Sequence, residues 1–216
     1  MDYASHVILC VCKRIWFWSS IRLVVKNILI AGDSFAAVWP GVYYGWPKML
    51  TEHYNITNLA QAGVSEYKIL KQLKSVDLSK FDNIIVSHTS PSRVHTIEHP
   101  LHKEGLHKDC DLIYTDIADR NSLFNPSLRA AQGWFRYHYD DEYQLDIYDL
   151  VRKEIRSLLG SHNYISITHT DISTKHALEH NNISFVDLWN QEKGTVNHYS
   201  FEGNKKIFKQ LVDIIQ

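Results

Sequence analysis

Residues 27–35, Asn-Ile-Leu-Ile-Ala-Gly-Asp-Ser-Phe, constrain the fold of this chain more than any other stretch. The apolar, β-branched beginning is typical of a strand buried on both faces, as in parallel sheets covered by helices. The glycine then allows a sharp turn, and Asp33 and Ser34 follow where the strand ends. In α/β proteins the chemistry lies at the carboxyl ends of the strands, so this turn is the first candidate for a site.

Apolar strand-like segments alternate with helical patterns along the rest of the chain. Strands are expected at 54–59, 81–86, 164–167 and 183–186, and helices at 42–53, 65–73, 142–159 and 201–215. Ser65 is the expected N-cap of the second helix, and Gly160 should end the third. The alternation predicts parallel strands joined by right-handed crossovers. We therefore expect a three-layer α/β/α sandwich over residues 27–216, with a mostly parallel sheet of about five strands in flavodoxin-like order.

The first 26 residues form an N-terminal extension ahead of this domain. Basic residues break its apolar runs, which are therefore too short for a spanning helix of about 20 apolar residues. The arrangement also lacks the cleavage site of a signal peptide. We expect an added helix or a disordered extension. An interfacial membrane anchor, with Trp16 and Trp18 among the headgroups, is the less favoured interpretation.

Charge and cysteine content narrow the function classes. The formal net charge of −1 gives no electrostatic case for nucleic-acid binding. The three cysteines are too few and too unevenly placed for a disulfide framework, which favours a reducing, cytoplasmic setting. We expect no cofactor.

Residues 88–140 interrupt the alternation and are rich in proline, histidine and aromatic residues. A long insertion of this kind usually serves function, so we expect a cap or a substrate-facing lobe. On a helix, His95, His99 and His102 would share one face, and zinc accepts such ligands. The nearby prolines oppose a regular helix, however, and we expect a solvated loop without a metal.

Two residues of the insertion are candidates for substrate binding. Arg93 follows the third strand and suits a substrate carboxylate or hydroxyl, with a surface salt bridge as the alternative. Trp134 belongs to a cluster with Phe135, Tyr137 and Tyr139, which suits stacking on a sugar ring or packing within a strand or a lobe core.

A second polar turn, residues 197–204, precedes the last expected helix. Ser200 can cap that helix, which would hold His198 in a fixed loop. Histidine is the usual base for a serine nucleophile. Taken separately, Ser34 is as consistent with a helix cap as with a nucleophile, and His198 with an ordinary loop residue.

Three short segments have to be considered together: Gly32-Asp33-Ser34-Phe35, residues 58–63 (Asn-Leu-Ala-Gln-Ala-Gly) and His198-x-Ser200-x-x-Gly203-Asn204. Together they resemble the SGNH, or GDSL, hydrolase family. The resemblance implies that Ser34 is the nucleophile, that the backbone N–H groups of Ser34 and Gly63 bind the oxyanion, and that His198 is the base. It also implies that Asp33 supports the turn from behind the reacting groups, by hydrogen bonds to the backbone.

The chain departs from the family pattern at two positions. The family has an asparagine after the third strand, where this chain has Ser-His-Thr-Ser; Thr89 or Ser90 could donate a hydroxyl instead, and Thr89 is favoured by register. The family also has an aspartate three residues before the histidine, where this chain has Thr195. Thr195 can orient the imidazole without adding charge, and Asp187, after the fifth strand, or Glu192 is a candidate acid.

These features predict a serine-dependent ester hydrolase acting on a small-molecule or glycan ester, with deacetylation of a carbohydrate as one form. It would use a Ser34–His198 dyad or an atypical triad. Three alternatives stay open: acyl transfer to an alcohol, a catalytically degenerate glycan-binding module, and a metal-dependent hydrolase that uses the insertion histidines.

Overall fold

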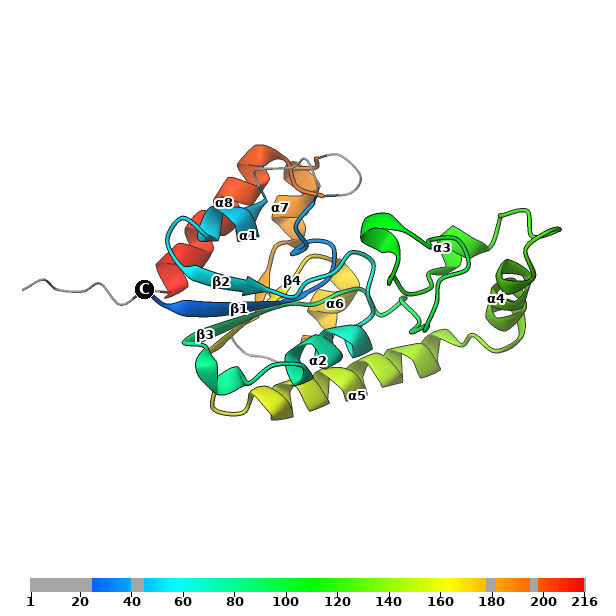
Figure 1. Cartoon of the computed structure of the whole chain (residues 1–216), viewed down its shortest axis with the longest axis horizontal. Coiled ribbons are helices and arrows are strands. Elements are labelled where there is room, and N and C mark those ends of the chain that lie inside the picture. Colours follow the sequence, from blue (N-terminus) through cyan, green and yellow to red (C-terminus); the bar gives the residue numbers. More distant parts are fainter. Residues whose placement is uncertain (1–24, 40–44, 178–181, 195–197, 216) are drawn as a thin grey trace, which may run out of the picture.

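The computed structural model describes residues 25–39, 45–177, 182–194 and 198–215. Its centre is a five-stranded, all-parallel sheet in the order β2-β1-β3-β4-β5, which confirms the predicted flavodoxin-like order (Figure 1). The strands are β1 (Asn27–Gly32), β2 (Asn55–Asn58), β3 (Asn83–Ser87), β4 (Tyr164–Thr168) and β5 (Ile183–Ser184).

Helices cover both faces of the sheet, as expected for three layers (Figure 1). One face packs against α1 (Trp46–Leu50), α7 (Val186–Gln191) and α8 (Phe201–Ile215). The other face packs against α2 (Glu66–Lys74) and the long α5 (Asp141–Leu159). Strands β1 and β3 carry apolar side chains on both faces and are buried throughout their centres, which explains their near-continuous apolar sequence.

Most predicted elements are present, with shifted ends. Residues 40–44 lie outside the described residues, so the start of the helix expected at 42–53 is untested there. Ser65 occupies the N-cap of α2 but makes no capping hydrogen bond with its side chain. Two short helices, α6 (Asp171–Lys175) and α7, were not predicted, because each is too short for a clear apolar period.

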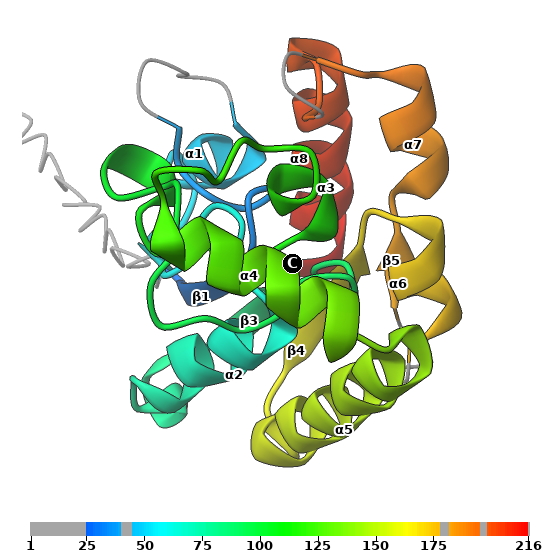
Figure 2. The ribbon, with the colours of Figure 1, turned by 90° about the vertical axis from the view of Figure 1, so that its right-hand side faces the viewer.

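The insertion forms a lobe beyond the carboxyl ends of the strands (Figures 1 and 2). It contains the 3-10 turn η2 (Gly105–His107), α3 (Tyr114–Ile117) and α4 (Pro126–Tyr137). The lobe has a small core of its own, made of Leu112, Ile117, Leu128, Ala131 and Phe135. The strand alternative for the aromatic cluster is wrong, since most of it lies on α4, where Trp134 and Phe135 pack against the lobe core and Tyr137 is exposed.

Residues 1–24 lie outside the described residues, so the interpretations of the N-terminal extension, including Trp16 and Trp18, remain untested. Within the part of the chain that the structure describes, none of the helices is both long and apolar enough to cross a bilayer.

Candidate active site

Segments far apart in the sequence meet at the carboxyl edge of the sheet. Ser34 from the turn after β1, Gly63 from the turn after β2 and His198 from the loop before α8 line one pocket of about 310 Å³. The insertion supplies much of the remaining wall. Its contributions are Arg93, His102, His107, Cys110 and Asp116.

The turn that carries Ser34 is held from several sides. The Asp33 carbonyl accepts hydrogen bonds from the N–H groups of Ala36 and Ala37 at 3.1 and 3.0 Å, so a tight turn follows the strand directly. The indole N–H of Trp39 donates to the Ser34 carbonyl at 3.0 Å. The Asn58 amide donates to the Ala36 carbonyl at 2.9 Å and so ties the Ser34 turn to the end of β2.

Close packing of β1 on β3 explains the glycine ahead of this turn. A Cβ atom at Gly32 would lie 2.6 Å from Ser87 Cβ and 2.8 Å from the Ser87 carbonyl oxygen. The Gln72 side chain on α2 bonds both the N–H and the carbonyl of Gly32, at 2.8 and 3.1 Å. Glycine is therefore required for the strand to end at this point.

Asp33 lies behind Ser34 and is only 3% exposed. Its Oδ1 atom accepts the Phe35 N–H at 3.0 Å, which is the backbone contact expected for its supporting role. Burial raises the pKa of this carboxyl to about 6, although the Arg93 charge and the Thr89 hydroxyl oppose the shift. Asp33 therefore changes charge in the mildly acidic range.

Gly63 has a left-handed backbone, with φ of +74°. A Cβ atom there would lie 2.7 Å from Cys110 Cβ, so the insertion packs directly on this turn. The Gly63 carbonyl accepts hydrogen bonds from the Asp111 N–H at 2.9 Å and from Arg93 Nη1 at 3.2 Å. These contacts hold the carbonyl side of Gly63, next to the N–H expected to bind the oxyanion, and they place a guanidinium at the same pocket.

The His198 ring packs between two aromatic residues of the Ser34 turn. Its centroid lies 5.2 Å from that of Phe35 and 4.6 Å from that of Trp39. Ser200 caps α8, as predicted, since its Oγ accepts the Gly203 N–H at 3.1 Å. The imidazole therefore belongs to the immediate surroundings of Ser34.

The candidate acids Asp187 and Glu192 are not among the described residues that line the pocket. Asp187 is exposed in the first turn of α7. Glu192 bonds Ser200 Oγ at 3.0 Å and Lys206 Nζ at 2.5 Å, so it serves the start of α8. Thr195 lies outside the described residues. Asp116, from the insertion, is the carboxyl group that shares the pocket with His198.

The segment after β3 is oriented differently from the expectation. The described pocket lining includes neither Thr89 nor Ser90. The Thr89 N–H donates to Glu66 Oε2 at 3.3 Å and its carbonyl accepts the Tyr148 hydroxyl at 3.0 Å, while Ser90 Oγ bonds Ser92 Oγ at 2.9 Å. The oxyanion roles of Thr89 and Ser90 stay predictions, and Arg93 is the donor from this segment that reaches the pocket.

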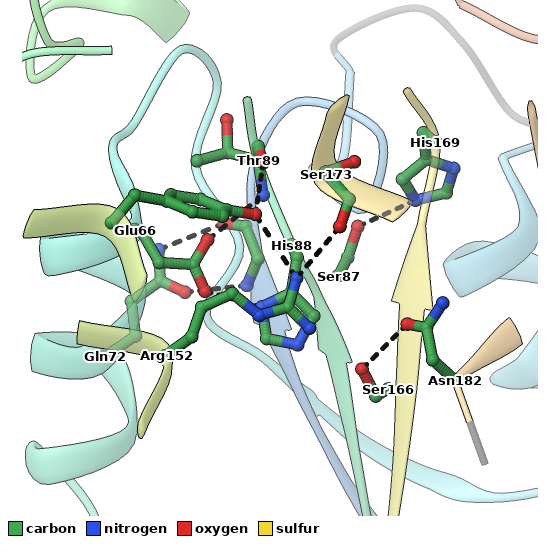
Figure 3. Close-up of polar contacts among 12 residues, drawn as sticks. Glu66, Gln72, Ser87, His88, Thr89, Arg152, Ser166, His169, Ser173 and Asn182 are labelled. Carbon is green, nitrogen blue, oxygen red and sulfur yellow. Dashed lines mark hydrogen bonds and ion pairs between the residues drawn. The ribbon is translucent and has the colours of Figure 1, made fainter. Parts of the chain in front are cut away.

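Buried polar pairs below the pocket escaped the sequence analysis (Figure 3). His88 Nδ1 lies 2.5 Å from Glu66 Oε1, which joins the end of β3 to the start of α2. His169, directly after β4, bonds Ser87 Oγ at 2.9 Å and the Tyr199 hydroxyl at 2.7 Å. Both histidines directly follow a strand of the structure, two residues after the end predicted for that strand, and that position was the available signal.

His169 supports the site from below in its neutral form. Its ring stacks on Phe35 with centroids 4.4 Å apart and an interplanar angle of 11°. Burial and the neighbouring histidines lower its pKa to about 3. A neutral, stacked ring adds no charge beneath the pocket.

The two residues predicted to contact the substrate do not share the Ser34 pocket. Arg93 lines the Ser34 pocket, whereas Trp134 lines a different pocket of about 220 Å³ between the lobe and α5. Arg93 also lines this second pocket and therefore stands between the two. The expectation of a solvated histidine loop is wrong for His99, which is fully buried, although the absence of a regular helix there is confirmed.

A scan against protein-family models finds no match to this chain, and a search of curated proteins finds none either. The resemblance to SGNH hydrolases therefore depends on the three short segments and on the fold that connects them.

Proposed function

We propose that this protein is a serine-dependent ester hydrolase that acts on a small-molecule or glycan ester. The supporting observation is that Ser34, Gly63 and His198, from three distant segments, line one pocket at the carboxyl edge of the sheet. That edge is where open α/β sheets bind their ligands.

In the proposed reaction, His198 removes the hydroxyl proton of Ser34 as the serine oxygen attacks the ester carbonyl. The backbone N–H groups of Ser34 and Gly63 stabilise the oxyanion, and Arg93 adds positive charge on the same side of the pocket. His198 then protonates the leaving alcohol. Water, activated by the same imidazole, releases the acyl group and restores Ser34.

Cys110 is a competing nucleophile in the same pocket, but its environment disfavours that role. Burial raises the pKa of its thiol to about 11. The thiolate is the reactive form of cysteine, so at neutral pH Cys110 is almost entirely unreactive thiol. Ser34, which lines the same pocket as the His198 imidazole, is the better candidate.

The first test compares hydrolysis of a short-chain aryl ester by the full chain and by Ser34→Ala and His198→Ala. Each variant should lose at least about 1,000-fold in kcat, because triad-type residues act as a unit. His138→Ala is the matched control: it removes an exposed histidine at the end of α4 and should leave turnover unchanged. Undiminished turnover in Ser34→Ala would remove Ser34 from the mechanism.

A non-catalytic glycan-binding module is the second candidate. It is favoured by the exposed position of Asp187, which leaves the expected acid away from the pocket. A fluorophosphonate probe separates the two, because labelling requires an activated hydroxyl. Labelling of the full chain but not of Ser34→Ala supports the hydrolase. Absence of labelling, together with saturable binding of an acetylated oligosaccharide, supports the binding module.

A further inference from the structure

Three potential metal ligands from the insertion lie together beside the pocket. One ring nitrogen each of His99 and His102 and the Sγ atom of Cys110 all lie within 4.8 Å of one another. Ligand atoms around tetrahedral zinc lie about 3.3–3.6 Å apart, given bonds of about 2.0–2.3 Å. Closing this cluster on an ion therefore needs shifts of about 1 Å.

The second observation that points to a bound ion concerns His99. Its side chain is fully buried, and its Nε2 atom has no hydrogen-bond partner within the described part of the chain. The other ring nitrogen, Nδ1, accepts the N–H groups of Leu101 and His102, both at 3.2 Å. A buried imidazole nitrogen without a partner is costly, and native proteins rarely keep one without a reason. Because Nδ1 is the acceptor here, Nε2 carries the ring proton, and a bound ion becomes its partner once that proton has moved to Nδ1.

We propose that His99, His102 and Cys110 bind a zinc ion. Two imidazoles and one thiolate suit this borderline-soft ion, and three protein ligands leave its fourth position open. His102 and Cys110 line the Ser34 pocket whereas His99 lies behind them, so the open position faces the pocket. The inference is independent of the hydrolase proposal, because none of the three ligands takes part in the attack by Ser34.

The proton balance of binding follows from the ligands. Cys110 binds as thiolate, so its thiol proton passes to solvent as the S–Zn bond forms. At His99 the ring proton moves from Nε2 to Nδ1, which gives up two long backbone hydrogen bonds in exchange for the N–Zn bond.

The cluster has further polar neighbours. The His107 ring lies 5.6 Å from that of His102, and Asp116 acts electrostatically on both His99 and Cys110. The negative charge of Asp116 is suited to balancing the charge of the bound ion. An ion bound here would also account for the many ionisable side chains that the insertion contributes to one wall of the pocket.

The test uses the full, untagged chain with Cys10→Ser and Cys12→Ser, so that Cys110 is the only cysteine. After dialysis against a chelator, zinc is titrated calorimetrically in two buffers of different ionisation enthalpy, and Co²⁺ in a parallel absorption experiment. We expect one ion per chain, about one proton released from the thiol, and a cobalt spectrum with tetrahedral bands and a thiolate charge-transfer band.

Variants assign the ligands. His99→Ala and Cys110→Ser should each weaken zinc binding by more than the roughly 10- to 100-fold that loss of an outer-shell partner costs. His138→Ala removes an exposed histidine of the same lobe and should bind zinc unchanged. If a variant fails to fold, the cobalt spectrum of the parent decides, because it needs no ligand variant. Fewer than about 0.1 zinc per chain at saturation, or a spectrum without the thiolate band, overturns the proposal.

Discussion

The Asp33 carboxyl is buried behind Ser34. Burial raises its pKa, and the Arg93 charge is the main influence that lowers it. Its pKa is raised from 3.8 to about 6, so the folded state favours the protonated form. Below about pH 4 the carboxyl is protonated in both states and the full stability is present. As pH rises through 6, the folded protein must ionise a buried group, and part of the stability is lost.

The substitution Asp33→Asn tests the direction in which stability changes with pH. Asparagine keeps the shape and the acceptor for the Phe35 N–H but has no charge. From pH 4 to pH 8, the free energy of unfolding of the variant should rise relative to the parent by up to about 3 kcal/mol, since each pKa unit corresponds to about 1.4 kcal/mol. Urea unfolding at the two pH values measures this difference. A difference that does not change with pH would contradict the prediction.

Gly63 and Gly105 have similar backbone conformations but different surroundings, so their substitutions can be compared. Both have positive φ, of 74° and 68°, but a Cβ would meet Cys110 only at Gly63 and open space at Gly105. Gly105→Ala should cost about 1 kcal/mol of stability for backbone strain alone. Gly63→Ala should cost about 2 kcal/mol more, because the insertion must also move away from the turn. Thermal unfolding of both variants checks the difference, and equal losses would argue against tight packing at Gly63.

At the scale of elements, buried polar contacts join helices to the sheet edge. The Glu66–His88 contact connects the first turn of α2 to the end of β3, and Glu66 also accepts the Thr89 N–H. Glu66, at the start of α2, therefore positions the first two residues of the segment that leads to Arg93.

Removing Glu66 should accordingly be costly. Glu66→Ala leaves buried groups without a partner and should lower the free energy of unfolding by about 3–5 kcal/mol. Glu154→Ala is the control, because it breaks a half-exposed contact with Lys74 of 2.7 Å and should cost less than about 1 kcal/mol. Chemical denaturation of both variants measures the contrast. A loss below 1 kcal/mol for Glu66→Ala would show that the pair adds little.

The sequence predicted elements well where one apolar period runs over a whole segment, as in β1, β3, α5 and α8. It failed where tertiary contacts decide. Ser65 has the right residue type and position for a cap, but its hydroxyl makes no capping bond. Phe135, Tyr137 and Tyr139 suited a strand by their spacing of two, yet α4 carries Phe135 and Tyr137; the alternative prediction, packing in a lobe core, is confirmed for Phe135. The pairing of His88 with Glu66 depends on sheet order, which no local pattern contains.

At the scale of the whole molecule, two bodies of unequal size share the pocket. The sheet and its helices have two large apolar cores, whereas the lobe has a small one. Small cores give low local stability, so the lobe should open more readily than the sheet. The wall that carries Arg93 and Cys110 would open with it.

Leu128→Ala tests this difference. The residue is 1% exposed in the lobe core, and its truncation should cost that core about 2–5 kcal/mol. Amide hydrogen exchange should then become faster across residues 112–139, with little change in β1 and β3. Ile85→Ala, in the centre of the sheet, is the control and should accelerate exchange throughout the protein. Uniform acceleration in Leu128→Ala would mean that lobe and sheet unfold as one unit.

The packing of α8 against the face of β1 also affects the order of events during synthesis. Ile28 and Ile30 are synthesised before the other strands, whereas their partners Ile207 and Leu211 follow the last strand of the sheet. Until α8 is made, this face of the nascent sheet keeps exposed apolar surface, which favours aggregation or binding by a chaperone. His198 directly precedes the same helix, so the pocket that it shares with Ser34 is completed only after the whole sheet has been synthesised.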